Sequence, residues 1–174
     1  SGAKLLPPIK GLCALNGIQA AVEGALVLAK GTGSIIEMGG QSSKYITGFS
    51  PDDQTGIQIS INSSCAAGTG AFLEEQLSRL GLKLEDYAPF AAKAKSIPRI
   101  AGRCSVFAKT DIAHHQQQGV SVEDILMGLA FAVVKNYRGS VMKKLPRKKP
   151  ILFAGGVSQN QAIVTAIKDV LLLE

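Results

Sequence analysis

Tryptophan is absent from this sequence of 174 residues, and aromatic residues make up only 5% of it. The chain therefore lacks the side chains that usually stack on nucleic-acid bases. Its three cysteines are an odd number without a close pair, which excludes a disulfide scaffold and favours free thiols in a reducing compartment. No apolar run reaches the roughly 18 residues of a membrane helix, and the N-terminal residues do not have the pattern of a signal peptide. These absences predict a soluble, cytoplasmic protein.

The charge balance is basic, since 19 Lys and Arg residues against 13 Asp and Glu residues give a formal net charge of 19 − 13 = +6. Much of the excess lies in residues 143–149, which follow a predicted helix, precede a predicted strand and contain no aromatic residue. That pattern is typical of a solvated loop rather than of a nucleic-acid surface. With 46% hydrophobic residues, the length predicts one domain, residues 1–174, with a sizeable core.

Short apolar segments and Gly or Pro turns alternate along the chain, which predicts a mixed α/β fold. Strands are expected over residues 34–38, 44–47, 57–61 and 150–154, the second and third forming a hairpin and the last being buried. Helices are expected over residues 15–29, 69–80 and 84–95 (which Pro89 can break), from 105, from 122 to about 144, and from 159 onward. The last helical run stops at Glu174 without a cap, which predicts a piece of a longer protein.

The helix expected from residue 122 has a clear start signal. Ser121 has the character of an N-cap, and Asp124 stands at the capping-box position three residues later. We therefore expect the two side chains to cap this helix together.

Two strand–Gly-Gly turns stand far apart in the sequence, at Gly39-Gly40 and at Gly155-Gly156. A glycine pair after a buried strand lets backbone N–H groups approach a phosphate or a base without interference from a Cβ atom, although many such turns bind nothing. The second pair also precedes a predicted helix, whose N-terminus favours an anion. The sequence has neither a phosphate-loop motif nor the glycine pattern of a dinucleotide-binding domain, which disfavours those two classes.

Cys65 and Cys104 each come directly before a predicted helix, 104 − 65 = 39 residues apart. The dipole of a helix favours a thiolate at its N-terminus. Two such thiolates are half of a Cys₄ set, so a symmetric dimer could hold one 4Fe–4S cluster on its two-fold axis. Spacing alone leaves open the alternative of two buried, inert cysteines. The third cysteine, Cys13, lies in an apolar stretch and is interpreted as a packing residue.

Three segments together resemble one family. Residues 65–73 (Cys-Ala-Ala-Gly-Thr-Gly-Ala-Phe-Leu), 103–108 (Arg-Cys-Ser-Val-Phe-Ala) and 153–160 (Phe-Ala-Gly-Gly-Val-Ser-Gln-Asn) are similar to the ATP-dependent activators of 2-hydroxyacyl-CoA dehydratases. The ATPase subunits of benzoyl-CoA reductases belong to the same family. Residues 35–44 resemble its second phosphate motif, and the resemblance extends from about residue 15 to residue 172. The resemblance makes the cluster, rather than inert thiols, the favoured interpretation of the cysteines.

The resemblance implies a fold, a set of cofactors and a set of partners. The fold is an actin-like ATPase (ribonuclease H-like) lobe with a helical insertion. A homodimer of the family shares one 4Fe–4S cluster, whose ligands here would be Cys65 and Cys104 of each subunit. ATP binding and hydrolysis drive a low-potential electron to an acyl-CoA dehydratase or reductase component, and a ferredoxin or flavodoxin re-reduces the activator. Neither nucleic acid nor a membrane is an expected partner.

The resemblance also implies a nucleotide site for ATP or ADP with magnesium. The residues it places near the phosphates are Glu37, Gly39, Gly40, Gln41 and Lys44, and those near the adenosine are Gly155, Gly156 and Asn160. No catalytic residue is assigned.

The chain departs from the family pattern in four ways. The first phosphate motif and the C-terminal Gly-Ala-x-Gly-Ala-Ala segment are absent, Ser42 replaces an Asp, and Lys109 replaces a Glu. The two missing segments predict a truncated activator domain with weakened nucleotide affinity, whereas ATPase activity is expected of a full-length member. Two other hypotheses remain: a kinase-like ATP-binding domain of the same fold without a cluster, and a non-enzymatic scaffold.

Overall fold

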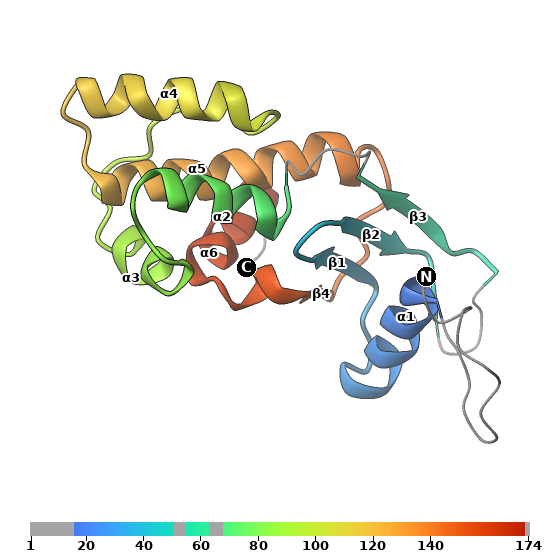
Figure 1. The fold of residues 1–174 in the computed structure, drawn as a ribbon. Helices are drawn as coiled ribbons and strands as arrows, with labels where there is room; N and C mark the ends of the chain where they lie inside the picture. Colours follow the sequence, from blue (N-terminus) through green and yellow to red (C-terminus); the bar gives the residue numbers. More distant parts are fainter. Residues whose placement is uncertain (1–15, 51–54, 63–67, 173–174) are drawn as a thin grey trace, which may run out of the picture.

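A computed structural model describes residues 16–50, 55–62 and 68–172 of the chain. Its centre is a four-stranded mixed sheet with the strand order β3-β2-β1-β4 (Figure 1). The strands are β1 (Ser34–Met38), β2 (Ser43–Thr47), β3 (Gln58–Ile61) and β4 (Ile151–Ala154). The first three form an antiparallel meander, and β4 pairs in parallel with β1.

The side chains of β1 and β2 alternate between two hydrophobic cores because successive residues of a strand point to opposite faces. Ile35 and its partner Ile46 pack on helix α1 (Gly17–Leu28). Ile36 and its partner Tyr45 face the helices on the other side of the sheet. The sheet is thus covered on both faces, by one helix on one side and by the remaining helices on the other (Figure 1).

Most of the helical layer is inserted between β3 and β4, and its last two elements follow β4. Its elements are α2 (Gly70–Arg79), the 3₁₀ turn η2 (Leu84–Asp86), α3 (Tyr87–Ala91), α4 (Ser105–Gln117), α5 (Val122–Tyr137) with its π-helical continuation η3 (Arg138–Met142), and, after β4, the 3₁₀ turn η4 (Gly156–Gln159) and α6 (Gln161–Leu171). No helix of the described residues has both the length and the apolar character needed to cross a membrane.

Helix α5 is the centre of this layer and is buried along most of its length. Two tyrosines fix it to its neighbours: the Tyr87 hydroxyl donates to the Leu126 carbonyl (2.8 Å), and the Tyr137 hydroxyl donates to the Lys44 carbonyl (2.6 Å). Burial raises the pKa of both phenols, so both remain neutral hydrogen-bond donors at physiological pH. The second bond links the helical layer directly to strand β2.

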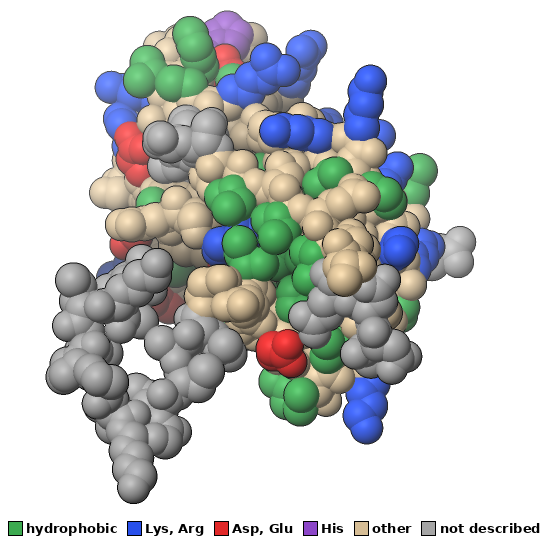
Figure 2. Space-filling view, turned by 90° about the vertical axis from the view of Figure 1, so that its right-hand side faces the viewer, with side chains coloured by type: hydrophobic (Ala, Val, Ile, Leu, Met, Phe, Trp, Pro, Cys, Tyr) green, Lys and Arg blue, Asp and Glu red, His purple; other side chains and the backbone are tan. Residues whose placement is uncertain are grey.

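The face that includes β3 carries hydrophobic side chains near its centre, with Lys and Arg side chains around them (Figure 2). Strand β3 is an edge strand, and its Ile59 and Ile61 are 42% and 48% exposed. The basic segment 143–149 is exposed apart from Leu145, as the predicted solvated loop requires.

The mixed α/β fold and most of the predicted elements are confirmed, with three corrections. The helix expected over residues 84–95 is replaced by a 3₁₀ turn and a five-residue helix that contains Pro89. The strand expected to be buried, β4, is half-buried. The helix expected from residue 159 begins at Gln161, because Gly156–Gln159 form a 3₁₀ turn first.

The predicted cap of α5 is confirmed only in part. The Ser121 hydroxyl accepts from the Asp124 N–H at 3.2 Å, as expected of an N-cap. The Asp124 carboxylate instead accepts from the backbone N–H groups of Lys95 (2.6 Å) and Ser96 (2.9 Å). These bonds lower the pKa of Asp124 and attach the loop before α4 to the start of α5.

Gly155 is predicted to be essential for stability. Its φ is +93°, and a Cβ atom there would lie 2.3 Å from the Met38 carbonyl oxygen. We expect Gly155→Ala to lower the free energy of unfolding by about 2–4 kcal/mol, from backbone strain and steric overlap together. Urea denaturation measures the change. Gly156→Ala is the matched control, since a Cβ atom there meets nothing within 4 Å; equal losses in the two variants would contradict the assignment.

Candidate functional site

The two glycine turns meet at one edge of the sheet. Strands β1 and β4 are parallel neighbours, so the turns that follow them lie side by side, although Glu37 and its partner Ala154 are 154 − 37 = 117 positions apart in the sequence. A crevice at the carboxyl ends of parallel strands is a common place for a ligand. Here the two turns share a cavity of about 600 Å³. Its walls are formed by Gly40, Gln41, Gly70, Ala71, Leu73, Glu74, Leu84, Glu85, Ala88, Gly156, Val157, Gln159 and Asn160.

The first turn also holds the start of helix α2. The Gly70 N–H donates to the Gly39 carbonyl (2.9 Å), and the Ala71 N–H donates to the Gly40 carbonyl (2.8 Å). The N-cap residue Thr69 makes no side-chain capping bond, so these carbonyls perform the capping. A Cβ atom on Gly70 would lie 3.3 Å from the Gly40 Cα atom, which explains why a glycine begins the helix.

The second turn leads into helix α6. The Asn160 side-chain oxygen accepts from the Ala162 N–H at 3.0 Å and caps the helix. Two helices of ten or more residues, α2 and α6, thus begin at the cavity wall. Because a helix N-terminus carries partial positive charge, this end of the cavity suits an anionic group.

Glu37 and Lys44 face each other across β1 and β2 and form an ion pair. Each side chain is only 20% exposed, and the Lys44 ammonium also donates to the Ser42 hydroxyl (3.3 Å). Neither residue is part of the cavity wall. The pair stands behind the first turn, where it ties together the two strands that the turn connects.

The structure therefore separates the eight predicted nucleotide residues into two sets. Those that line the cavity are Gly40, Gln41, Gly156 and Asn160, and those that lie outside its wall are Glu37, Gly39, Lys44 and Gly155. Gly39 contributes the carbonyl that holds α2, and Gly155 contributes the close approach to Met38. The role of all eight in nucleotide binding stays a prediction.

Two acidic residues of the cavity wall, Glu74 and Glu85, escaped the sequence-based prediction. Glu74 is four residues after Gly70 on α2, so the two lie on one helical face. The four-residue spacing between Gly70 and Glu74 is the feature of the sequence that could have identified Glu74 as a wall residue. Glu85 lies in the 3₁₀ turn η2, which the sequence pattern had assigned to a longer helix.

Cys104 lies at the N-cap position of α4 and is half-buried; its role as a cluster ligand stays a prediction. It lines a second hollow, of about 1300 Å³, together with Arg99, Arg103 and Lys135. Cys65 and Cys13 lie outside the described residues. Asn62, three positions before Cys65 in the sequence, lines the same hollow as Cys104. Within the described ranges, no three His, Cys, Asp or Glu side chains gather as a metal site.

Comparison with known proteins defines the family. Residues 14–172 match the BadF/BadG/BcrA/BcrD ATPase family, and the chain belongs to it. The chain is 32% identical over 163 residues to the activator of lactoyl-CoA dehydratase from Anaerotignum propionicum, with 90% of this chain and 60% of the relative covered. It is 30% identical over 141 residues to the (R)-2-hydroxyglutaryl-CoA dehydratase activating ATPase of Acidaminococcus fermentans, with 81% and 53% covered.

Solved structures agree with this assignment. Component A of the Acidaminococcus fermentans (R)-2-hydroxyglutaryl-CoA dehydratase matches with a TM-score of 0.79 at 29% identity, over 87% of this chain and 57% of that one. The activator of the 2-hydroxyisocaproyl-CoA dehydratase from Clostridium difficile, solved with bound ADPNP, matches with a TM-score of 0.77 at 26% identity, over 87% and 55%. The predicted actin-like ATPase fold and the predicted family are confirmed. The chain spans a little over half the length of these relatives.

Proposed function

We propose that this chain is the nucleotide-binding and cluster-binding part of an ATP-driven activator of a 2-hydroxyacyl-CoA dehydratase or a related acyl-CoA reductase. The observation that carries the proposal is the cavity in which two glycine turns and the first residues of α2 meet, with α6 starting beside them. The activators that this chain resembles, one of them solved with ADPNP, support it.

The nucleotide would bind with its phosphates at the first turn. Gly40 and Gln41 line the cavity, and Gly40 has no Cβ atom that could obstruct an approaching oxygen. The adenosine would then extend past the second turn, along Gly156 and Val157. Magnesium would accompany the phosphates, as it does in other ATPases.

A route from the nucleotide to the proposed cluster ligands would run through the first turn and the start of α2. The carbonyls of Gly39 and Gly40 hold the first two amides of α2, and Cys65 stands five residues before Gly70 in the sequence. A movement of the first turn on nucleotide binding therefore acts on the start of α2 without an intermediate element. We propose that hydrolysis changes the setting of the cysteine segments in this way.

The residues fit an iron–sulfur cluster shared by two subunits. Cys104 presents a half-buried thiol at the N-cap position of α4. With Cys65 as the second ligand, a homodimer supplies the four thiolates of a 4Fe–4S cluster. When bound, the cluster would supply a low-potential electron. Next to Cys104, Val106 and Phe107 are 63% and 65% exposed, which suits contacts with a second subunit or with the dehydratase.

Two kinds of partner protein would be needed, one to supply the electron and one to accept it. A ferredoxin or flavodoxin would reduce the activator, and the acyl-CoA dehydratase or reductase component would accept the electron. Arg99, Arg103 and Lys135 give the hollow beside Cys104 an excess of positive charge over its one carboxylate, Asp111. That charge favours encounter with acidic redox proteins.

Nucleotide binding is tested with a pair of glycine variants. Gly40→Ala places a methyl group at the cavity wall, in space that no described atom fills within 4 Å. We expect it to leave stability within about 0.5 kcal/mol and to weaken ADP binding roughly tenfold, because the methyl group occupies the path of the phosphates. Isothermal titration with MgADP measures the affinity. Gly24→Ala on α1 is the control; no ADP binding by the unmodified chain, or an equal effect of both variants, would contradict the site.

Cluster binding is tested by iron and acid-labile sulfide analysis of the anaerobically reconstituted protein. We expect about two irons and two sulfides per chain, since one 4Fe–4S cluster serves two subunits. Cys65→Ser and Cys104→Ser should each abolish this content, whereas Cys13→Ser should retain it. ADP binding without any iron would instead support a kinase-like ATP-binding domain of the same fold.

A further inference from the structure

The cavity between the glycine turns has two chemically different ends along helix α2. At the start of the helix, Gly40, Gln41 and Gly70 form the wall. Farther along the helix, the wall is formed by the carboxylates of Glu74 and Glu85 and by Leu84 and Ala88 of η2 and α3. The cavity therefore suits an elongated ligand with an anionic end and an uncharged end that donates hydrogen bonds.

This inference rests on the proposed function: if a nucleotide binds in the cavity, the charge of the wall determines its orientation there. The carboxylates of Glu74 and Glu85 repel phosphate groups, which leaves the glycine end as the place for the phosphates. The next part of the ligand, the ribose, then lies against the wall just beyond. Carboxylates accept hydrogen bonds from hydroxyl groups, and an acidic residue commonly binds the ribose 2′-hydroxyl in nucleotide-binding folds.

Glu74 is the carboxylate at the right depth. It is four residues beyond Gly70, one helical turn, and so about 6 Å along the helix axis from the residue that contacts the first turn. Both residues line the cavity. Glu74 is exposed, and within the described part of the chain its carboxylate has no hydrogen-bond or ion-pair partner. It is thus available to a ligand.

We propose that Glu74 accepts hydrogen bonds from the ribose hydroxyl groups of the nucleotide and so selects ribonucleotides over deoxyribonucleotides. The base would continue past Gly156 and Val157 toward Leu84 and Ala88, the apolar part of the wall. Glu74 is a specificity residue in this proposal and takes no part in phosphate chemistry.

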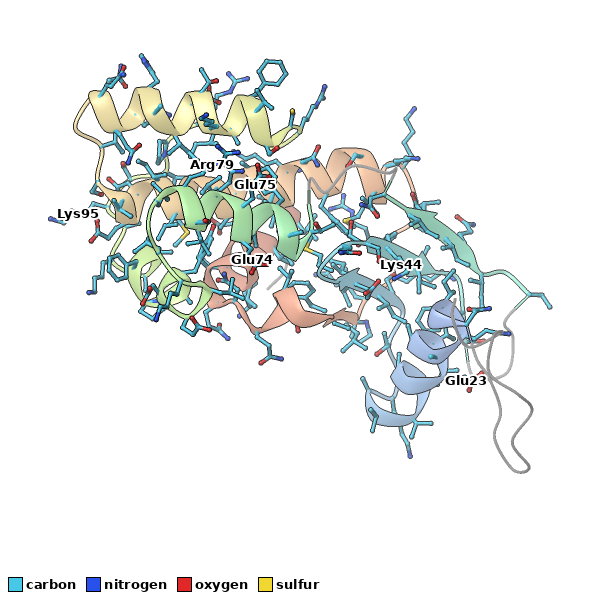
Figure 3. The ribbon with its side chains drawn as sticks, viewed as in Figure 1. Glu23, Lys44, Glu74, Glu75, Arg79 and Lys95 are labelled. Atoms are coloured by element: carbon cyan, nitrogen blue, oxygen red, sulfur yellow. The ribbon has the colours of Figure 1, made fainter. Side chains whose placement is uncertain are left out.

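The neighbouring residue Glu75 provides a matched control. It points to the other side of α2, toward α4, where it pairs with Arg79 at 2.6 Å (Figure 3). The Arg79 guanidinium, helped by a hydrogen bond from Ser105, holds the pKa of Glu75 below its usual value. Glu75 is not part of the cavity wall. Two adjacent glutamates on one helix thus differ in whether they face the proposed ligand.

The experiment compares the affinities of the chain for ADP, 2′-deoxyADP and 3′-deoxyADP by isothermal titration. We expect the unmodified chain to bind ADP about tenfold more tightly than at least one of the deoxynucleotides, the effect of one hydrogen bond to a charged group. In Glu74→Ala this preference should fall to less than twofold, because the ligand hydroxyl then has no partner to lose. Glu75→Ala should keep the tenfold preference.

Each outcome has a distinct meaning. Equal affinities of the unmodified chain for ADP and both deoxynucleotides would overturn this inference and leave the proposed function intact. A ribose preference that survives in Glu74→Ala and disappears in Glu85→Ala would assign the role to the other carboxylate and also overturn it. No binding of any of the three nucleotides would contradict the proposed function itself. Circular dichroism confirms that each variant is folded.

Discussion

The parallel pairing of β1 with β4 is the constraint on which the site depends. Residues 34–37 lie in register with residues 151–154, so the chain must return across the whole helical insertion to complete the sheet. This pairing brings together two glycine turns that are far apart in the sequence. It also explains why Gly155 has a positive φ and lies against the Met38 carbonyl: the turn after β4 must clear the end of β1 at close range.

A second constraint follows from the first. The turn after β1 caps α2 with two backbone carbonyls, and the turn after β4 leads into α6, which its own Asn160 caps. Helices α2 and α6 are therefore attached to the same edge of the sheet that forms the cavity. A ligand bound there contacts the sheet and the start of α2 at once. That arrangement suits a protein in which nucleotide binding must change the position of a group held outside the sheet.

The sequence contained the local signals for most of this architecture. Gly-Gly pairs after apolar strands, a cysteine before the start of α4 and Ser121 before α5 all led to correct local predictions. The failures had non-local causes. Asp124 had the right spacing for a capping box, but donors from residues 95 and 96 compete for its carboxylate. The orientation of Glu74 toward the cavity depends on how α2 packs, and the Glu37–Lys44 pair depends on the register of two strands.

Hydrogen–deuterium exchange with and without MgADP tests most directly whether the cavity binds nucleotide and whether the start of α2 responds. We expect slower exchange in three separate segments, residues 38–42, 69–73 and 155–161, with α1 (Gly17–Leu28) unchanged as the internal reference. Slower exchange confined to the segments around Cys104, or no change at either glycine turn, would contradict it.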